Sequence, residues 1–432
     1  MPETLTLRKQ ITQHLNDAMA LALSSERYPL WKRDCPELKD VDFIELGLLR
    51  CISIVDSGRH FLQTADELYG EQRPLSTYFN SLKSSRRTNM LEAVEQQSYK
   101  IHCETLQSQG VDYLKEFSEL AEYTVEAADG HFINHACHTK KGANGKVYAA
   151  GFIYALNLRY GLLRPLCHIT NGTIRHHEIP ALRTQLEKQN KKKKPLKKHL
   201  YIYDKAVTDY AWWDNQKQYG NYMISVLKEN SVASFVSAIS FDSSNEINTG
   251  IEQYSRYENK GVQFTVVDYR DPETKKLHRF ITTLNESMSP GIIALLYFKR
   301  WTIEKAFNNS KSNLKETKAW SGEVNSLKNQ MRLTAMSYNL TRVYEESSKI
   351  KQPGFMHPSD IKYTKALEKR QQVAKKKGCF VNALFFQVRI ARVSSRTIRG
   401  VQNAIITGKS VVSFMNDLVA QLVPMPGGKL EH

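Results

Sequence analysis

Residues 123–227 alternate between apolar, strand-like runs and amphipathic, helix-like stretches, and this alternation constrains the fold more than any other feature. Strands are predicted at 123–128, 146–158, 162–170, 199–204 and 221–227, and helices at 177–189 and 206–219. The first three strands follow one another directly, which suggests a meander, whereas a helix precedes each later strand. This order is typical of an α/β protein with a mixed sheet.

Two aspartates close two of these strands, Asp129 the first and Asp204 the fourth. If the two strands lie side by side, the aspartates face one another at one edge of the sheet. A helix packed across that edge would add Glu304 from farther along the chain. Three carboxylates can hold two Mg²⁺ ions about 3.5–4 Å apart, which activate a water or a 3′-hydroxyl and stabilise the leaving oxygen at phosphorus. Mn²⁺ is expected to substitute for Mg²⁺.

The helix that carries Glu304 is predicted to begin after Ser289-Pro290-Gly291 and to run through Lys311. Tyr297, Arg300, Glu304 and Lys311 fall within about 60° of one another around such a helix. Arg300 and Lys311 would offset phosphate charge beside the metal ions. The alternative is a solvated helix face with local ion pairs.

The formal net charge of +17 favours an anionic partner, with nucleic acid the first candidate. A basic loop at 191–198 strengthens this interpretation, and we expect its Lys192 and Lys193 to contact phosphate. No apolar run approaches the roughly 20 residues needed to span a bilayer, and the start of the chain does not resemble a secretory signal. Six scattered cysteines without a Cys-x-x-Cys pair indicate a reducing compartment.

The N-terminal part, residues 1–115, is predicted to be helical and to form a DNA-binding domain. Helices at 57–69 and 75–83, separated by a Gly/Pro break at 70–74, resemble a helix-turn-helix reader of DNA. An ordinary helical hairpin with a polar outer face is the alternative. The predicted DNA contacts of this region are Tyr78, Asn80, Lys83, Arg86 and Arg87.

The remaining chain divides by its pattern into four further regions. Residues 116–228 form the first part of a catalytic core, and 229–286 a β-rich insertion with strands at 261–269 and 277–284. Residues 287–347 form the second part of the core and include a long helix at 323–346. Residues 348–432 are helical and basic, without a motif that indicates a role.

Two further groups of residues allow competing interpretations. The cluster of His131, His135, Cys137 and His138 could hold zinc, but its spacing matches no structural zinc pattern. A role of His131 as an outer-sphere or DNA contact is favoured over zinc. Stacking on an extruded base is conceivable for Trp212, Trp213 and Trp301, although buried aromatic residues are the more frequent case.

The pattern Tyr297-x2-Arg300-x3-Glu304-x6-Lys311 resembles the Tyr-Arg-Glu-Lys signature of the insertion-sequence-four group of bacterial DDE transposases. Its neighbours in Arg300-Trp301-x-Ile303-Glu304 are similar to the local consensus of that family. Asp129-Gly130 and Asp204-Lys205-Ala206 resemble the first two catalytic aspartate motifs, and Phe79-Asn80-Ser81-Leu82 is similar to the helical DNA-binding domains of some members. The resemblance covers roughly residues 40–345.

The resemblance implies an RNase H-like α/β core that is interrupted by a β-rich insertion and flanked by helical regions. Asp129, Asp204 and Glu304 would be the catalytic metal ligands, while Tyr297, Arg300 and Lys311, with Trp301, would contact DNA. The implied activity is cleavage at the terminal inverted repeats of a transposon and transfer of the 3′-hydroxyl ends to target DNA. Members act as synaptic homodimers, and we expect a cytoplasmic, nucleoid-associated protein.

Two other functions remain open from the sequence. One is an RNase H-like DNA nuclease without strand transfer, and the other is a domesticated, sequence-specific DNA-binding regulator. An intact set of three acidic residues argues against the regulator, since carboxylates repel DNA and serve no purpose in binding alone.

Overall fold

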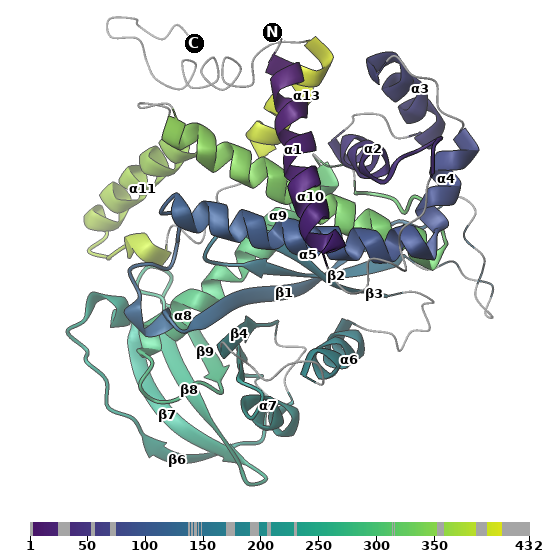
Figure 1. Ribbon diagram of the computed structural model, residues 1–432. Coiled ribbons are helices and arrows are strands. Elements are labelled where there is room, and N and C mark those ends of the chain that lie inside the picture. The colour runs from purple at the N-terminus through teal and green to yellow at the C-terminus, as the bar shows by residue number, and fades with distance from the viewer. Residues whose placement is uncertain are drawn as a thin grey trace, which may run out of the picture.

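The computed structural model (Figure 1) describes most of the chain, with gaps. The described residues are 3–24, 35–52, 57–69, 75–136, 139, 141, 145, 147, 149–169, 178–190, 198–204, 209–228, 231–312, 314, 316–351, 358–385 and 395–407. Lys192 and Lys193 of the predicted basic loop lie outside them, as do Cys137 and His138 of the conceivable zinc cluster and the predicted break at 70–74.

Nine strands form one mixed sheet in the order β3-β2-β1-β4-β5-β9-β8-β7-β6. Their bounds are β1 Tyr123–Ile133, β2 Ala150–Asn157, β3 Leu162–Ile169, β4 Lys198–Ile202, β5 Asn221–Val226, β6 Ser234–Ala238, β7 Ile251–Asn259, β8 Val262–Arg270 and β9 Leu277–Thr282. The central strands β1, β4 and β5 are parallel, and every other neighbouring pair is antiparallel. The predicted α/β class and the initial three-strand meander are therefore confirmed.

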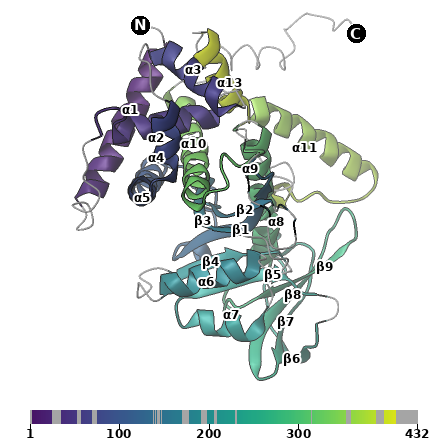
Figure 2. The ribbon, with the colours of Figure 1, turned by 90° about the vertical axis from the view of Figure 1, so that its right-hand side faces the viewer.

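Helices cover both faces of the central strands (Figure 2). Their bounds are α6 Glu178–Asn190, α7 Tyr210–Lys217, α8 Pro290–Lys299, α9 Trp301–Ser312 and α10 Val324–Lys351. One apolar cluster joins α8, α9 and α10 to one face of the sheet, and a separate cluster joins α6 and α7 to the other face. The strands are buried on both sides for this reason, and β2 has no exposed residue.

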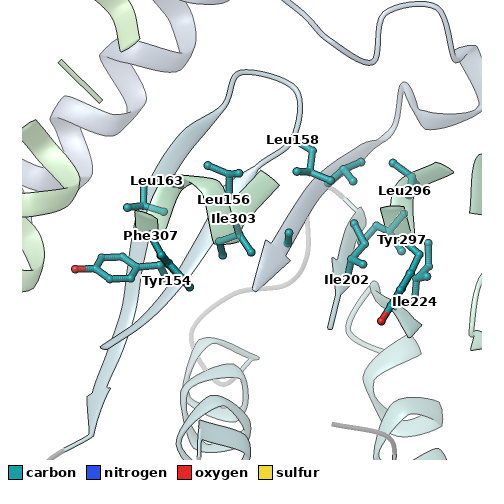
Figure 3. Close-up of a cluster of buried hydrophobic side chains, with 14 of the residues drawn as sticks. Tyr154, Leu156, Leu158, Leu163, Ile202, Ile224, Leu296, Tyr297, Ile303 and Phe307 are labelled. Atoms are coloured by element: carbon teal, nitrogen blue, oxygen red, sulfur yellow. The ribbon is translucent and has the colours of Figure 1, made fainter. Parts of the chain in front are cut away.

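The face under α8 and α9 is packed with large apolar side chains (Figure 3). Ile303 and Phe307 of α9 lie against β1 and β2, while Leu296 and Tyr297 of α8 lie against β4 and β5. Burying one such side chain contributes roughly 1.5–3 kcal/mol, so this contact holds both helices firmly on the sheet. The same contact places the N-terminal half of α9 above β1.

The N-terminal helices pack onto the rest of the chain rather than apart from it. Their bounds are α1 Glu3–Leu23, α2 Asp40–Ile52, α3 Gly58–Tyr69, α4 Leu75–Lys83 and α5 Ser85–Ser108. They share an apolar cluster with Leu333 and Met336 of α10, which also contacts β3. The helical character predicted for this region is confirmed, and α10 joins it to the sheet.

The predicted β-rich insertion extends the central sheet. Its strands β6 to β9 form an antiparallel ribbon, and β9 pairs with β5 through Ile224↔Thr282 and Val226↔Phe280. The predicted hairpin at 270–273 is the turn between β8 and β9. The insertion therefore shares one hydrogen-bonded sheet with the strands that precede it.

Two predicted boundaries were wrong. The first strand does not stop at Asp129, because β2 pairs with β1 up to Ile133↔Ala150 on the side away from β4. The single helix expected to begin after Gly291 and to run through Lys311 is two helices, α8 and α9, with Arg300 between them. At this break the Thr302 hydroxyl donates a hydrogen bond to the carbonyl of Lys299 at 2.5 Å, and a side-chain donor there commonly accompanies a helix bend.

The C-terminal region contains α11 Pro358–Lys376 and α13 Ser395–Thr407. In both views α11 projects from the body of the molecule (Figures 1 and 2). Among the helices that the structure describes, none has the length and the apolar run required to cross a bilayer.

Candidate active site

Strand pairing places Asp129 and Asp204 at matching positions. The last registered pair of the parallel β1–β4 ladder is Ala127↔Ile202, and each aspartate lies two residues beyond its member of that pair. Side chains alternate between the two faces of a strand, so the aspartates share the face of Ala127 and Ile202. Both of these residues belong to the cluster under α8 and α9. The predicted side-by-side placement of the two strands is thus confirmed, and both aspartates lie on the α9 side.

Arg300 joins two of the three predicted acids. Its Nη1 lies 3.2 Å from Oδ2 of Asp129, and its Nη2 lies 3.1 Å from Oε1 of Glu304. The guanidinium side chain is only 7% exposed, whereas the Glu304 side chain is 49% exposed. Arg300 is thus a buried cation between two carboxylates, Asp129 in the sheet and Glu304 at the surface.

The break between α8 and α9 gives Arg300 this position. Its backbone N–H still donates to the carbonyls of Leu296 and Tyr297 at 3.2 and 3.1 Å, which closes the last turn of α8. Its own carbonyl accepts a hydrogen bond from Ile303 at 3.0 Å, which begins α9. Arg300 therefore belongs to both helices, and its side chain points toward Asp129 within β1.

Four surrounding features act on the pKa of Asp129: burial, Arg300, the Gly130 N–H and the two other carboxylates. Burial raises the pKa of Asp129, Arg300 lowers it in part, and so does the Gly130 N–H that donates to Oδ1 of Asp129 at 2.8 Å. The negative charges of Glu304 and Asp204 raise the pKa of Asp129 further. Crowded carboxylates of this kind hold protons or cations more tightly than isolated ones do.

Arg300 remains charged in this environment. Burial lowers its pKa, but Tyr297, Asp129 and the other acids more than compensate, and the pKa of Arg300 is raised overall. A permanent positive charge at this point stabilises the acidic cluster when no other cation is bound.

Tyr297 lies behind Arg300, not at the surface. It is 8% exposed, its ring centre is 5.0 Å from that of Phe280, and Cζ of Arg300 is 5.7 Å from the Tyr297 ring centre. Burial raises the pKa of its hydroxyl. The predicted phosphate contact of Tyr297 is not favoured by this placement, which suits a residue that supports the Arg300 guanidinium.

Trp301 and Lys311 stand at the two ends of α9 and are both exposed. Trp301 is 50% exposed, directly after the buried Arg300, and Lys311 lies in the last turn. A large aromatic side chain in solvent beside an acidic site is available to stack on a ligand. Trp213, in contrast, is buried under the sheet, and Trp212 is half-buried over the Arg183 guanidinium.

The donor set suits a hard divalent cation, and Asp129, Asp204 and Glu304 are the residues that would hold one. Carboxylate oxygens are the ligands that Mg²⁺ prefers, and two of these acids already converge on a single positive group, Arg300. Within the described part of the chain, no group of three or more His, Cys, Asp or Glu residues lies close enough together to hold a metal ion. Metal binding would therefore draw the acids closer and loosen their contacts with Arg300.

A buried polar group that the sequence did not reveal supports the site from below. The Tyr154 hydroxyl donates to Oε1 of Glu316 at 2.9 Å, and Nε2 of His131 lies 3.1 Å from Oε2 of Glu316. The His131 ring centre is 4.9 Å from that of Phe307 on α9. The group thereby joins β1, β2 and the segment after α9. His131 is buried, a placement that does not favour direct contact with DNA, and its expected role as an outer-sphere or DNA contact stays a prediction.

The N-terminal residues predicted to contact DNA have divergent positions. Tyr78 is buried among aromatic side chains, and Arg87 is buried and donates to the carbonyl of Lys39 at 3.3 Å. Arg86 binds both carboxylate oxygens of Asp40 at 2.7 and 2.9 Å. Both residues stabilise the helical region from within, and their contact with DNA stays a prediction that this placement does not support.

Asn80 and Lys83 remain at the surface of α4. The pattern of polar residues at spacings of three or four in the sequence of α4 did not distinguish the exposed Asn80 and Lys83 from buried neighbours such as Tyr78. Two aromatic neighbours of Tyr78, Phe43 and Phe61, are supplied by other helices, and the sequence of α4 alone does not reveal them.

Comparison with known proteins agrees with this geometry. The family model for the transposase DDE domain matches residues 122–340, which is about half of the chain and extends from β1 into α10. The chain therefore belongs to this family of transposases, and its mixed sheet with flanking helices agrees with the expected RNase H-like core. No curated protein matches the chain. A transposase acts on DNA, so the expected nucleic-acid partner follows from the family.

Proposed function

We propose that the chain is a cut-and-paste transposase of the insertion-sequence-four group. It binds the terminal inverted repeats of its element, cleaves the DNA there and joins the freed 3′-hydroxyl ends to target DNA. The observation that supports this most is the matching register of Asp129 and Asp204 beneath the Arg300–Glu304 pair. A bacterial protein with this substrate works in the cytoplasm beside the nucleoid.

Asp129, Asp204 and Glu304 are the proposed catalytic residues, and they would hold two Mg²⁺ ions, or Mn²⁺ in their place. When bound, such ions supply Lewis-acid activation of the attacking oxygen and neutralise the leaving oxygen. The Asp129 side chain is 21% exposed and the Glu304 side chain 49%, so an approaching DNA backbone would reach Glu304 first. Conversion of either carboxylate to an amide removes the charge and retains the shape.

The proposed chemistry consists of two displacements at phosphorus. In cleavage, the oxygen of a water forms a bond to phosphorus and the water releases a proton to solvent, while the bond from phosphorus to the 3′-oxygen breaks and that oxygen takes up a proton to become the 3′-hydroxyl. In joining, the freed 3′-hydroxyl forms a bond to a target phosphorus and loses its proton, and the target's own 3′-oxygen leaves and is protonated. Neither displacement needs an oxidant or a nucleotide.

Arg300 has the position to exchange one partner for another. In the absence of substrate its two nitrogens contact Asp129 and Glu304. A scissile phosphate at the same point presents the same planar pair of oxygens, which a guanidinium binds in a bidentate manner. We infer that Arg300 transfers at least one of its hydrogen bonds from a carboxylate to the phosphate.

The DNA on either side of the cleaved phosphate would contact further residues of the chain. We assign the exposed Trp301 and Lys311 of α9 and Asn80 and Lys83 of α4 to this interface. Lys192 and Lys193, which lie outside the described residues, are assigned to it from the sequence. Two protomers, each holding one end, would make the synaptic homodimer that paired cleavage requires.

A cleavage and joining assay tests this function. The substrate is a plasmid with the element's own inverted repeats, incubated with the protein and Mg²⁺ or Mn²⁺, and a second plasmid serves as target. We expect single-turnover cleavage to fall more than about 100-fold in Asp129→Asn, Asp204→Asn and Glu304→Gln. The reason is that losing a metal ligand should lower activity more than losing an outer-shell partner of a ligand does. End binding should persist in all three.

Asp214→Asn is the matched control, because Asp214 is an exposed acid of α7 that pairs with Lys217. It should retain full activity. Cleavage without joined products would identify the chain as a nuclease, and binding without cleavage under either metal would identify a regulator. Either result would replace the proposed function.

A further inference from the structure

Four lysines form a continuous line on one side of α11. This lysine stripe consists of Lys362, Lys365, Lys369 and Lys376, all of them exposed. At about 100° per residue the four directions fall within roughly 60° of one another. Successive spacings of three, four and seven residues produce this alignment, so the lysines share one helix face.

The opposite side of α11 holds the helix in place. Tyr363 and Ala374 are buried there in a small cluster with Val381, which lies in the chain that follows the helix. Arg370 donates from Nε to Oε1 of Glu273 in the β8–β9 turn at 2.8 Å. The helix therefore presents a fixed face to solvent, and that face is the one with the lysines.

The lysine stripe contains no carboxylate. Glu368 is the only acid of α11 between Lys362 and Lys376, and its direction is about 90° from the middle of the stripe. Helices that are merely solvated commonly alternate charges at spacings of four residues, because such pairs stabilise them. The residues of α11 itself give this face a single sign of charge, and such a face attracts a partner of the opposite sign.

The dimensions of the stripe suit a nucleic-acid backbone. Lys362 and Lys376 are separated by fourteen residues, or about 21 Å at 1.5 Å per residue. Each strand of duplex DNA carries one phosphate per 3.4 Å of axis, so the stripe can follow about six phosphates. Lysines bind phosphate as point charges without a geometric requirement, which suits contact that is independent of sequence.

The segment after α11 connects the stripe to the candidate active site. The ring of Phe385 stacks on Tyr269 at 5.1 Å and lies 5.6 Å from Phe298, measured between ring centres. Phe298 belongs to α8, which ends directly before Arg300. DNA held by α11 is therefore held by a helix attached to the element that positions the catalytic arginine.

We propose that the lysine stripe of α11 binds the backbone of duplex DNA irrespective of sequence and holds the target DNA. The identity of this DNA as the target rests on the proposed function, since strand transfer needs a second duplex of arbitrary sequence. A role in self-association is disfavoured, because two copies of the stripe would repel one another.

Binding of a random-sequence duplex to the full chain, measured by fluorescence anisotropy over a salt series, tests the stripe. The variant is Lys362→Gln/Lys365→Gln/Lys369→Gln, which preserves helix propensity at exposed positions. Each lost phosphate contact lowers the slope of log K against log salt by about 0.9, so we expect a decrease of about 2.7. The same positions changed to Arg should retain the slope.

A control variant removes three other lysines, Lys100→Gln/Lys115→Gln/Lys217→Gln, for the same change in net charge. A slope that falls no more in the stripe variant than in this control would overturn the proposal. Tighter binding of duplex RNA than of duplex DNA would overturn the assignment of the partner.

Cleavage and joining by the same variants separate the stripe from the proposed function. We expect the stripe variant to cleave transposon ends normally and to yield fewer joined products at limiting target concentration. Equal loss of end cleavage and joining would show that the stripe holds the ends, and would overturn its assignment to target DNA. If the unmodified chain cleaves nothing, the proposed function fails, whereas the binding measurement still decides whether the stripe contacts DNA.

Discussion

Glu95 of α5 should make the stability of this protein depend on pH in a predictable way. The residue is 4% exposed, and its Oε1 is buried without a hydrogen-bond partner among the described residues. Burial raises the pKa of Glu95 from 4.5 to about 7, although Arg332 and Arg164 lower it in part. Glu95 lies where α5 packs against α10, the helix that joins the N-terminal region to the sheet.

The sign and size of the effect follow from proton linkage. Below pH 4.5 the carboxyl is protonated in both the folded and the unfolded chain, and it contributes no pH dependence. Between pH 4.5 and about 7 only the folded chain retains the proton, so stability falls as the pH rises. At about 1.4 kcal/mol per pH unit, the total loss is about 3 kcal/mol.

Glu95→Gln removes this titration while preserving shape. We expect the variant to gain about 3 kcal/mol relative to the unmodified protein between pH 4.5 and pH 8, measured by urea unfolding at both values. Glu104→Gln, at an exposed position of the same helix, should stay within about 0.5 kcal/mol at both values. A Glu95→Gln difference that does not change with pH would refute the reasoning, because a proton held by burial must be released in the unfolded chain.

Two further substitutions test the elements around the active site. Arg300→Lys should lower single-turnover cleavage by about 100-fold with little effect on end binding. The reason is that the single ammonium group of a lysine cannot bind Asp129 and a second group in one plane, as the guanidinium can. Unchanged cleavage would exclude the proposed exchange of partners. Gly291→Ala should destabilise the protein by about 1–3 kcal/mol, because its Cβ would overlap the carbonyl of Ile247 where α8 begins, and a melting temperature equal to that of the unmodified protein would contradict this packing.

The sequence predicted most strands and helices of the core because their signals are local. The predicted strand at 162–170 corresponds to β3 Leu162–Ile169, and the one at 221–227 to β5 Asn221–Val226. The boundary after Asp129 failed for a reason outside the strand. Asp-Gly is a strong turn signal, but the hydrogen bonds offered by β2 along the other edge continue the strand past it. Pairing between distant segments overrides local preference in such cases.

The acids of the candidate site were accessible from sequence, but their organisation was not. Helical periodicity placed Arg300 and Glu304 on one face, and their contact agrees with this. The same periodicity hid the break at Arg300, which depends on a side-chain hydrogen bond from Thr302 and on burial of α8 from all sides. Glu316 had no recognisable signal, because its partners come from strands more than 160 residues earlier. Such a contact is visible only in the folded chain.

The unbroken sheet has a consequence for distances during catalysis. From β4, which leads to Asp204, to the outer edge at β6 there are five strand-to-strand steps in one hydrogen-bonded sheet. At about 4.8 Å per step this separation is roughly 24 Å, close to the axial length of seven base pairs of B-form DNA. A change in that length would require the β5–β9 ladder to open, at about 1 kcal/mol for each hydrogen bond lost. Whatever the outer edge touches therefore stays at a constant distance from the cleaved phosphate, and adjustment between successive reaction steps must come from the DNA or from α9.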